Sequence, residues 1–130
     1  MAYYFSKILT SNHFDDAIEQ VTAELKKEGF GVLNEIDLQA TLKKKIDVDI
    51  KKYKILGACN PQYAYKAIQG EDKIGVFLPC NVIVQENKNG AIEVSAVDPI
   101  ASMISVENEN LGDIAYEIQQ KLKRVIDHLS

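Results

Sequence analysis

Two cysteines in similar local sequences are the residues most able to do chemistry in this chain. Cys59 and Cys80 are each followed by an asparagine, in the tetrapeptides ACNP (58–61) and PCNV (79–82). Cys59 ends an expected strand and precedes a helix start, where peptide N–H groups stabilise a thiolate. If the two strands are neighbours, the thiols could form a redox pair, a sulfur or persulfide acceptor, or half of a soft-metal site. The alternative is two small buried hydrophobic residues, the commonest role of free cysteine.

The spacing of these cysteines is not that of a known redox or zinc motif. Twenty residues separate them, unlike a CxxC pair, and a tetrahedral zinc site needs two further ligands. His13 and His128 fall at the start of one expected helix and the end of another, which favours plain surface positions. We therefore expect no metal site and no cofactor.

Three polar residues near the cysteines have structural interpretations beside the functional ones. Asn60, placed before Pro61, is a typical helix cap. Asn81 lies inside an expected strand, where asparagine is depleted; it either holds the loop at residues 59–61 or meets a ligand. Asp98, before Pro99, repeats the cap-then-proline pattern, and its own carboxylate argues against an anion there. The candidate binding residues are thus Cys59, Asn60, Pro61, Cys80, Asn81 and Asp98.

Other chemically capable residues form no convincing catalytic set. Glu35 and Asp37 share one side of an expected strand and could act as acid and base, but the sequence supplies no partner histidine or serine. Lys43–Lys45 could form a basic patch, although the neighbouring Asp47 and Asp49 favour a solvated helix end. The chain has no glycine pattern typical of a nucleotide site. We predict no catalytic residues, and this favours a binding protein over an enzyme.

Hydrophobic periodicity predicts the elements that position these residues. One apolar stripe, with spacings of four, three and four, predicts a helix from Asn12 to Gly29, and a longer stripe predicts a final helix from about Leu111, capped by Asn110. Asn89-Gly90 predicts a hairpin. The expected strands are 2–9, 30–37, 53–59, 82–86 and 91–97. The second strand is apolar on both faces and is therefore expected at the centre of the sheet. Asp37 is expected to cap a short helix from Leu38, and Ile74–Phe77 is expected to be extended.

This order of elements predicts an α+β fold. Two long helices with single apolar stripes and a forced hairpin favour a mostly antiparallel sheet with both helices packed on one face, in a single domain over residues 1–130. The other face then needs cover. Five tyrosines predict a partly apolar second surface, which a homodimer would bury: Tyr3, Tyr4, Tyr53, Tyr63 and Tyr65.

Composition indicates a globular, cytoplasmic chain with reduced thiols. The 130 residues carry a net charge of −4, which argues against a nucleic-acid partner. No apolar stretch reaches the roughly 20 residues of a membrane span, and the start lacks the pattern of a signal peptide. Two cysteines do not make a disulfide framework in a chain of this length. We predict neither nucleic-acid nor membrane partners.

The stretch from Ile55 to Val84, with the later SAVDP segment, resembles the domain-of-unknown-function 302 family of bacterial and archaeal proteins. The likeness also covers Lys7–Phe30 and so nearly the whole chain. It rests on GACNP (57–61), Ala64, Ile74-Gly75, LPCNV (78–82) and Asp98-Pro99. The resemblance implies a compact α+β domain that forms homodimers, and it implies no reaction. It marks as signature positions Cys59, Asn60, Pro61, Pro79, Cys80, Asn81, Asp98 and Pro99.

Two functional hypotheses follow. The first is a small homodimeric binding or accessory protein without catalysis, whose small-molecule ligand lies near Cys59, Asn60, Cys80 and Asn81. The second is a thiol-based protein that handles sulfur or senses redox state through Cys59 and Cys80. Thiol pKa values distinguish them, because only the second hypothesis needs a reactive thiolate at neutral pH.

Overall fold

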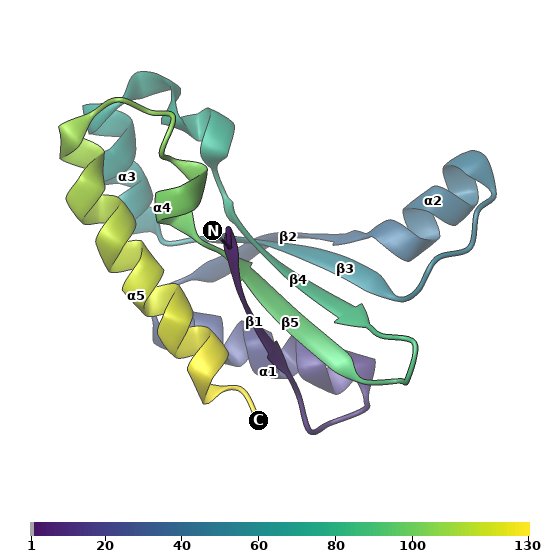
Figure 1. Ribbon diagram of the computed structural model, residues 1–130. Helices are drawn as coiled ribbons and strands as arrows, with labels where there is room; N and C mark the ends of the chain where they lie inside the picture. The colour runs from purple at the N-terminus through teal and green to yellow at the C-terminus, as the bar shows by residue number, and fades with distance from the viewer. Residues whose placement is uncertain (1) are drawn as a thin grey trace.

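The computed structural model describes residues 2–130 and contains one five-stranded antiparallel sheet, shown in Figure 1. The strands lie in the order β1-β5-β4-β3-β2. The predicted α+β class, antiparallel sheet and helix placement are confirmed. In chain order the elements are β1 (Tyr4–Ile8), α1 (Phe14–Lys27), β2 (Gly31–Asp37), α2 (Leu38–Ile46), β3 (Tyr53–Cys59), α3 (Pro61–Gly70), the 3-10 helix η1 (Asp72–Phe77), β4 (Cys80–Glu86), β5 (Ile92–Val97), α4 (Pro99–Ser102), the 3-10 helix η2 (Glu109–Leu111) and α5 (Gly112–His128).

The predicted hairpin joins β4 and β5. Gly90 has φ +82°, a left-handed conformation that glycine adopts without steric cost, and its N–H donates to the Asn87 carbonyl. The Asn89 side chain accepts from the N–H of Ala91 at 3.1 Å. This turn sets the register that pairs Val84 with Val94 in the middle of the sheet.

The two long helices cover one face of the sheet. The predicted apolar stripe of α1 is buried together with that of α5, and both pack on the inward residues of β3, β4 and β5. Side chains two residues apart along a strand point to the same face of the sheet. Alternate residues such as Val82 and Val84 of β4 therefore face the helices. The main core includes Val21, Leu25, Leu56, Val82, Val84, Val94, Ala96, Leu122 and Val125.

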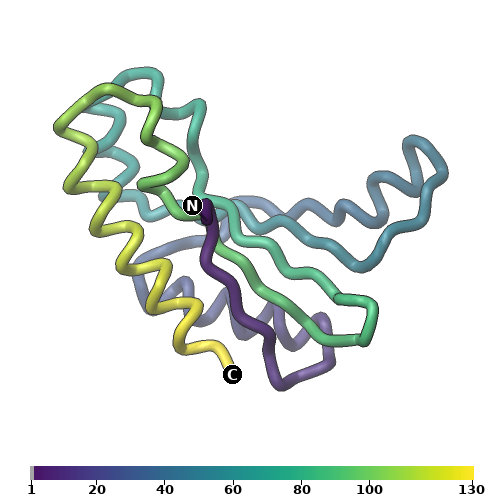
Figure 2. The backbone as a smooth tube through the Cα atoms, viewed as in Figure 1, coloured from purple at the N-terminus to yellow at the C-terminus, as the bar shows by residue number. Residues whose placement is uncertain are grey.

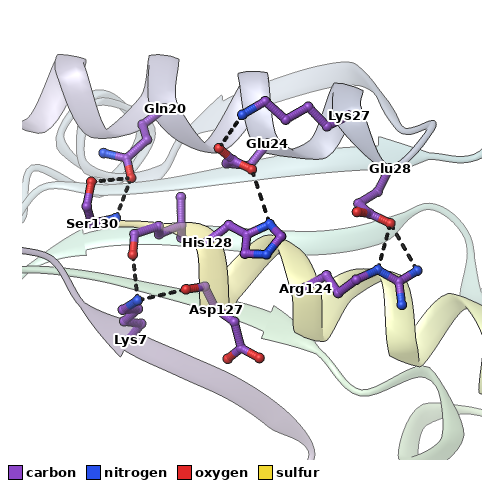
Figure 3. Close-up of polar contacts among 10 residues, drawn as sticks. Lys7, Gln20, Glu24, Lys27, Glu28, Arg124, Asp127, His128 and Ser130 are labelled. Atoms are coloured by element: carbon purple, nitrogen blue, oxygen red, sulfur yellow. Dashed lines mark hydrogen bonds and ion pairs between the residues drawn. The ribbon is translucent and has the colours of Figure 1, made fainter.

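Polar contacts join the end of α5 to α1 and β1, as Figure 3 shows. The Arg124 guanidinium pairs with the Glu28 carboxylate at 3.0 Å, and the Ser130 N–H donates to Gln20 Oε1 at 2.6 Å. Lys7 of β1 donates to the carbonyls of Asp127 and Leu129. These contacts cross between segments far apart in sequence and fix α5 against the edge strand.

The predicted central position of the second strand is wrong. β2 pairs only with β3 and forms an edge of the sheet, and six of its seven residues are exposed. Its register shifts between Val32 and Asn34, a bulge of the kind that disrupts pairing at sheet edges. The apolar residues on both faces, which suggested a buried strand, include Leu33 and Ile36, and both are exposed.

Residues 38–52, which we call the arm, extend away from the helix-covered body (Figures 1 and 2). The arm consists of α2 and the loop that leads into β3. Asp37 caps α2 as predicted, because its Oδ1 accepts from the Ala40 N–H at 2.9 Å. None of the residues of α2 is buried.

The opposite end of the sheet carries what we call the head, residues 71–79 and 98–111. It has a small core of its own, in which Ile74 and Leu111 are buried with Ala67 of α3. Two predictions for this region are wrong: residues 74–77 lie in η1 rather than in an extended segment, and Asn108 rather than Asn110 provides the side-chain cap before α5. Within residues 2–130, no helix is long and apolar enough to cross a bilayer.

Candidate binding site

The two cysteines lie on neighbouring strands but do not face each other in the register. Cys80 pairs with Ala58, and Cys59 is one residue further along β3, opposite Gly31 of β2. Successive strand residues point to opposite faces, so this register does not favour a facing pair of thiols. Both residues line a cavity of only about 30 Å³, together with Tyr63 and other, mainly apolar residues.

Burial raises the pKa of the Cys80 thiol to about 11, and the neighbouring Cys59 contributes further by charge repulsion. Cys80 packs against the main core. A thiolate is disfavoured in such a place because the charged form loses its hydration. Cys80 therefore has the properties of a buried hydrophobic residue rather than those of a nucleophile at neutral pH.

Asn60 occupies the N-cap position of α3, as predicted. Its side chain makes no capping hydrogen bond; instead Nδ2 donates to the Glu28 carbonyl at the end of α1, at 3.2 Å. The side chain is buried under Gly29, where an added Cβ would lie 3.1 Å from Asn60 Nδ2. Asn60 thus ties the start of α3 to the end of α1. Pro61 occupies the first position of α3, as predicted, and is exposed.

Asp98 is occupied by structural contacts. Its Oδ1 accepts from the Ile100 N–H at 3.0 Å, the predicted cap, and from Gln119 Nε2 of α5 at 3.1 Å. Asp37 is engaged similarly as the cap of α2, and the Glu35 side of β2 is exposed at the sheet edge. Within residues 2–130, no group of three or more His, Cys, Asp or Glu residues is placed to hold a metal ion.

Asn81, by contrast, is exposed on the face of the sheet opposite α1 and α5, which we call the open face. This face contains a concave groove of about 450 Å³. Alternation along the strands brings side chains from β1, β3, β4 and β5 together here. The groove is lined by Tyr3, Tyr4, Tyr53, Asn81, Ile83, Gln85, Glu93, Ser95, Ala96 and Val97.

Hydrogen bonds connect two lining residues of the groove, Glu93 and Ser95, to neighbouring side chains. Ser6 Oγ donates to Glu93 Oε2 at 2.8 Å and lies 2.9 Å from Ser95 Oγ. Asn87 Nδ2 lies at the longer distance of 3.5 Å from Glu93 Oε1. Of the lining residues within 2–130, Glu93 is the charged one. The described lining thus combines a single carboxylate with neutral donors and acceptors.

Aromatic rings line the groove from two strands. Tyr3 and Tyr4 pack edge to face with ring centroids 5.1 Å apart, and Tyr53 of β3 contributes the third ring. Two of the five tyrosines expected on this second surface lie elsewhere. Tyr63 packs against the main core, where the ammonium groups of Lys66 and Lys121 lie near its ring, and Tyr65 is exposed on α3.

The groove continues toward the head. An adjoining hollow of about 250 Å³ shares Asn81 and Val97 with the groove and is also lined by Val76 and Phe77 of η1. Gly57 lies beside this junction, where an added Cβ would come within 2.1 Å of Asn34 Oδ1 and 2.9 Å of Pro79 Cγ. The absence of a side chain at Gly57 allows Asn34 and Pro79 to approach the strand.

Sequence reasoning identified one residue of the groove as a candidate site residue, Asn81. Three of the five tyrosines expected on the second surface, Tyr3, Tyr4 and Tyr53, also line the groove, but Gln85, Glu93 and Ser95 were missed. The signal was available in β5, where Ile92, Val94 and Ala96 define the buried face and the residues between them must point to the open face.

Comparison with known proteins places this fold in a family. The family model described as domain of unknown function DUF302 matches residues 7–129. The crystal structure of an uncharacterized conserved DUF302 protein from Bacillus stearothermophilus is similar, with a TM-score of 0.92, 26% sequence identity and coverage of 100% of both chains. Among curated proteins, none matches. The chain belongs to the DUF302 family.

Proposed function

We propose that the protein is a cytoplasmic, homodimeric binding protein without catalytic activity, and that its ligand is a small flat molecule held in the open-face groove. The observation that carries this proposal is the groove itself. One face of the sheet is covered by helices, and the other is hollowed to about 450 Å³ and lined by three tyrosines. This volume lies within the range of small-molecule sites, which combine apolar walls with a few polar groups.

The lining chemistry favours a neutral or positively charged ligand. Tyrosine rings stack on flat molecules and attract cations through the negative faces of the rings. Asn81, Gln85 and Ser95 offer donors and acceptors, and Glu93 offers a negative charge. An anionic ligand would face that carboxylate, and the lining residues within 2–130 include no lysine or arginine to balance it.

The absence of a general base argues for binding rather than catalysis in this groove. Among residues 2–130, the charged side chain in the lining is that of Glu93, which already accepts a hydrogen bond from Ser6. A base in a catalytic site needs a lone pair aimed at the proton that it removes. We propose that Asn81 binds the ligand and that Cys59, Asn60, Pro61, Cys80 and Asp98 support the strands and helices around the groove.

The thiol-based alternative has less support. Two observations count against a reactive pair: the pKa of Cys80 is raised, and the register sets Cys80 opposite Ala58 and Cys59 opposite Gly31 rather than opposite each other. Alkylation tests it directly: we expect iodoacetamide at pH 7 to modify Cys80 slowly in the folded protein and rapidly in about 6 M urea, where burial is lost. Rapid modification of both folded cysteines would favour the thiol hypothesis.

Fragment binding followed by NMR tests the binding function. Isotope-labelled protein is titrated with a panel of flat aromatic amines and amides and with aromatic carboxylates of matched size. We expect the amines and amides to shift the backbone amide signals of Asn81, Glu93 and Ser95 and the carboxylates to leave them unchanged. No shift at these positions with any fragment would contradict the proposal.

Glu93→Gln and Glu19→Gln are a matched pair for this titration. Both substitutions remove one carboxylate, but Glu19 is an exposed residue of α1, on the helix-covered side of the sheet and outside the groove lining. We expect E93Q to weaken binding of amine fragments about tenfold or less, the usual size of a partly exposed charge contact, and E19Q to leave it unchanged. Equal effects of the two variants would mean that binding reports net charge alone.

A further inference from the structure

The arm is the part of this fold that a single copy leaves without a packing partner. It contains a nine-residue helix, α2, in which no residue is buried. Its main contacts are with β2 and β3, the two strands it joins. Isolated helices of this length are marginal in water, and most helices gain stability from an apolar face packed on another element. The apolar Ile46 of α2 is 64% exposed.

The arm also differs in charge from the rest of the chain. It carries five lysines and two aspartates, a net charge of +3, whereas the remaining residues carry ten basic and seventeen acidic side chains, a net charge of −7. Lys43 is paired within the arm to Asp47 at 2.9 Å and to Asp49 at 3.2 Å. Lys44 and Lys45 are exposed. The arm therefore presents free positive charge beside apolar surface.

The head has the complementary properties. It carries Lys73 and five acidic residues, Glu71, Asp72, Asp98, Glu107 and Glu109, a net charge of −4. Val76 is 81% exposed and Ile104 is 72% exposed. The hollow between Val76 and Asn81 makes this apolar surface continuous with the open face. Acidic residues thus surround exposed apolar side chains, as lysines do in the arm.

Arm and head lie at opposite ends of the sheet, with the open face between them (Figure 2). β3 leaves the arm at Tyr53 and reaches the α3 end at Cys59, a span of roughly 20 Å at about 3.3 Å per residue. A two-fold axis that lies between two facing open faces, parallel to them and perpendicular to the arm-to-head direction, would bring the arm of one copy to the head of the other. The same operation repeats the contact at the other end.

We propose that a second copy of this chain docks on the open face, with the arm of each copy on the head of the other. The proposal rests on the homodimer of the proposed function and specifies how it forms. Opposite charges meet at both ends in this arrangement. The alternative arrangement sets arm on arm and head on head, and like charges then repel at both contacts. The docked copies enclose the two grooves between them.

Sedimentation velocity of exposed double charge reversals tests the contact. K44E/K45E reverses two arm lysines, and K26E/K88E makes the same change of net charge at exposed positions outside the arm and head. We expect K44E/K45E to raise the dimer Kd by at least about tenfold at about 50 mM salt, and K26E/K88E to have a much smaller effect. Equal effects of the two variants would overturn the arm contact, because they would reflect net charge alone.

A complementary pair of variants makes the test specific. E107K/E109K reverses two exposed head residues, so its homodimer also carries repulsive contacts at both ends. Mixing K44E/K45E with E107K/E109K restores opposite charges at both contacts of the heterodimer. We expect the mixture to dimerise about as tightly as the wild-type chain. Circular dichroism and thermal melting of each variant verify that it is folded, and folded variants whose mixture stays monomeric would overturn the proposal.

The outcomes separate this inference from the proposed function. A wild-type dimer that none of these reversals affects would overturn the arm-to-head contact and leave the homodimer intact. A wild-type chain that is monomeric at about 100 µM, well above the Kd of a stable dimer, would overturn both the contact and the homodimer. Ligand binding in the groove is measured independently by the NMR titration, which reports on a monomer as well as on a dimer.

Discussion

Gly57 lies where three segments of the chain meet on the open face. Its strand, β3, pairs on one side with β2 and on the other with β4, and the side chains of Asn34 and Pro79 cover it. Any side chain at this position would have to displace Asn34, whose end is flexible, and Pro79, whose ring is rigid. Among the glycines in strands, Gly57 is thus a close-packing residue, whereas Gly31 has open space beside it.

We expect Gly57→Ala to destabilise the fold by about 1–3 kcal/mol, the usual cost of inserting a methyl group into packed surroundings. The new Cβ would lie 2.9 Å from Pro79 Cγ, a contact that movement of Asn34 cannot relieve. Urea unfolding measures the change. Gly31→Ala is the matched control, with no atom within 4 Å of its new Cβ, and we expect a much smaller change. Equal effects would assign the loss to strand glycines in general.

Cys80 makes stability sensitive to alkaline pH. The pKa of its thiol is about 11 in the folded protein, against 9.0 for an unperturbed thiol. Between pH 9 and pH 11 the unfolded chain releases this proton while the folded chain retains it, so stability falls as pH rises. We expect Cys80 to account for a loss of about 2–3 kcal/mol across this interval.

Urea unfolding of the wild-type chain and of Cys80→Ala from pH 8 to about pH 11 isolates this effect from other titrating groups. The variant loses stability at every pH through the cavity it creates, but its profile should fall less steeply above pH 9. Parallel profiles for the two proteins would contradict the assignment to Cys80.

At the scale of elements, helix α2 depends on its cap more than the other helices do. α1 and α5 are held by buried apolar stripes, whereas α2 has no buried residue and relies on local contacts. The Asp37 carboxylate accepts the hydrogen bond of the Ala40 N–H, and the Thr41 hydroxyl donates to the Asp37 carbonyl. Loss of the carboxylate therefore affects the arm before it affects the core.

We expect Asp37→Ala to increase hydrogen exchange at the amides of α2 about fivefold, which corresponds to about 1 kcal/mol of lost capping. Exchange in α1 and α5 and the global melting temperature should change little, because their packing does not involve Asp37. Mass spectrometry of exchanged peptides measures both. Asp37→Asn retains an acceptor oxygen and serves as control. Faster exchange throughout the chain would mean that α2 is coupled to global unfolding.

Most elements could be predicted from the sequence because their signals are local. The apolar stripes of α1 and α5 repeat at helical spacing, and Asn89-Gly90 specifies its turn. The order of strands depends instead on tertiary pairing, so the apolar side chains of β2 suggested a central strand although it lies at the edge. The side-chain partner of Asn60 could not be predicted for the same reason, because its hydrogen bond goes to the Glu28 carbonyl, 32 residues away in sequence.

The site was predictable only in part because a groove is a property of the whole molecule. Asn81 stood out as an unusual strand residue, and the tyrosines indicated a second surface. Ser95 and Glu93 are ordinary residues of an amphipathic strand, and they gain a role only when pairing brings them beside Ser6 of the distant β1. The cysteines drew attention through their chemistry, but Cys80 packs against the main core.

At the scale of the whole molecule, the fold divides into a well-packed body and an arm with few packing contacts. Proteases cut where backbone opens locally at low free energy cost. We expect the first tryptic cuts of dilute protein to fall in the arm at Lys43–Lys45, Lys51 or Lys52, ahead of Arg124 of α5, although Arg124 is also exposed. Mass spectrometry of a digestion time course identifies the sites. First cuts within α5 would contradict this division.

The position of β1 has a consequence for how the chain is made. β1 is the first strand, yet it pairs only with β5, and Ser6 is bonded to Ser95, 89 residues later. On a ribosome, β2, β3 and β4 emerge and can pair while β1 still has no neighbour. We expect pulse-labelled ribosome-bound chains to protect the β3–β4 amides before those of β1, since the longest loop closes last. β1 therefore stays unpaired until the ribosome has released its partner strand, β5.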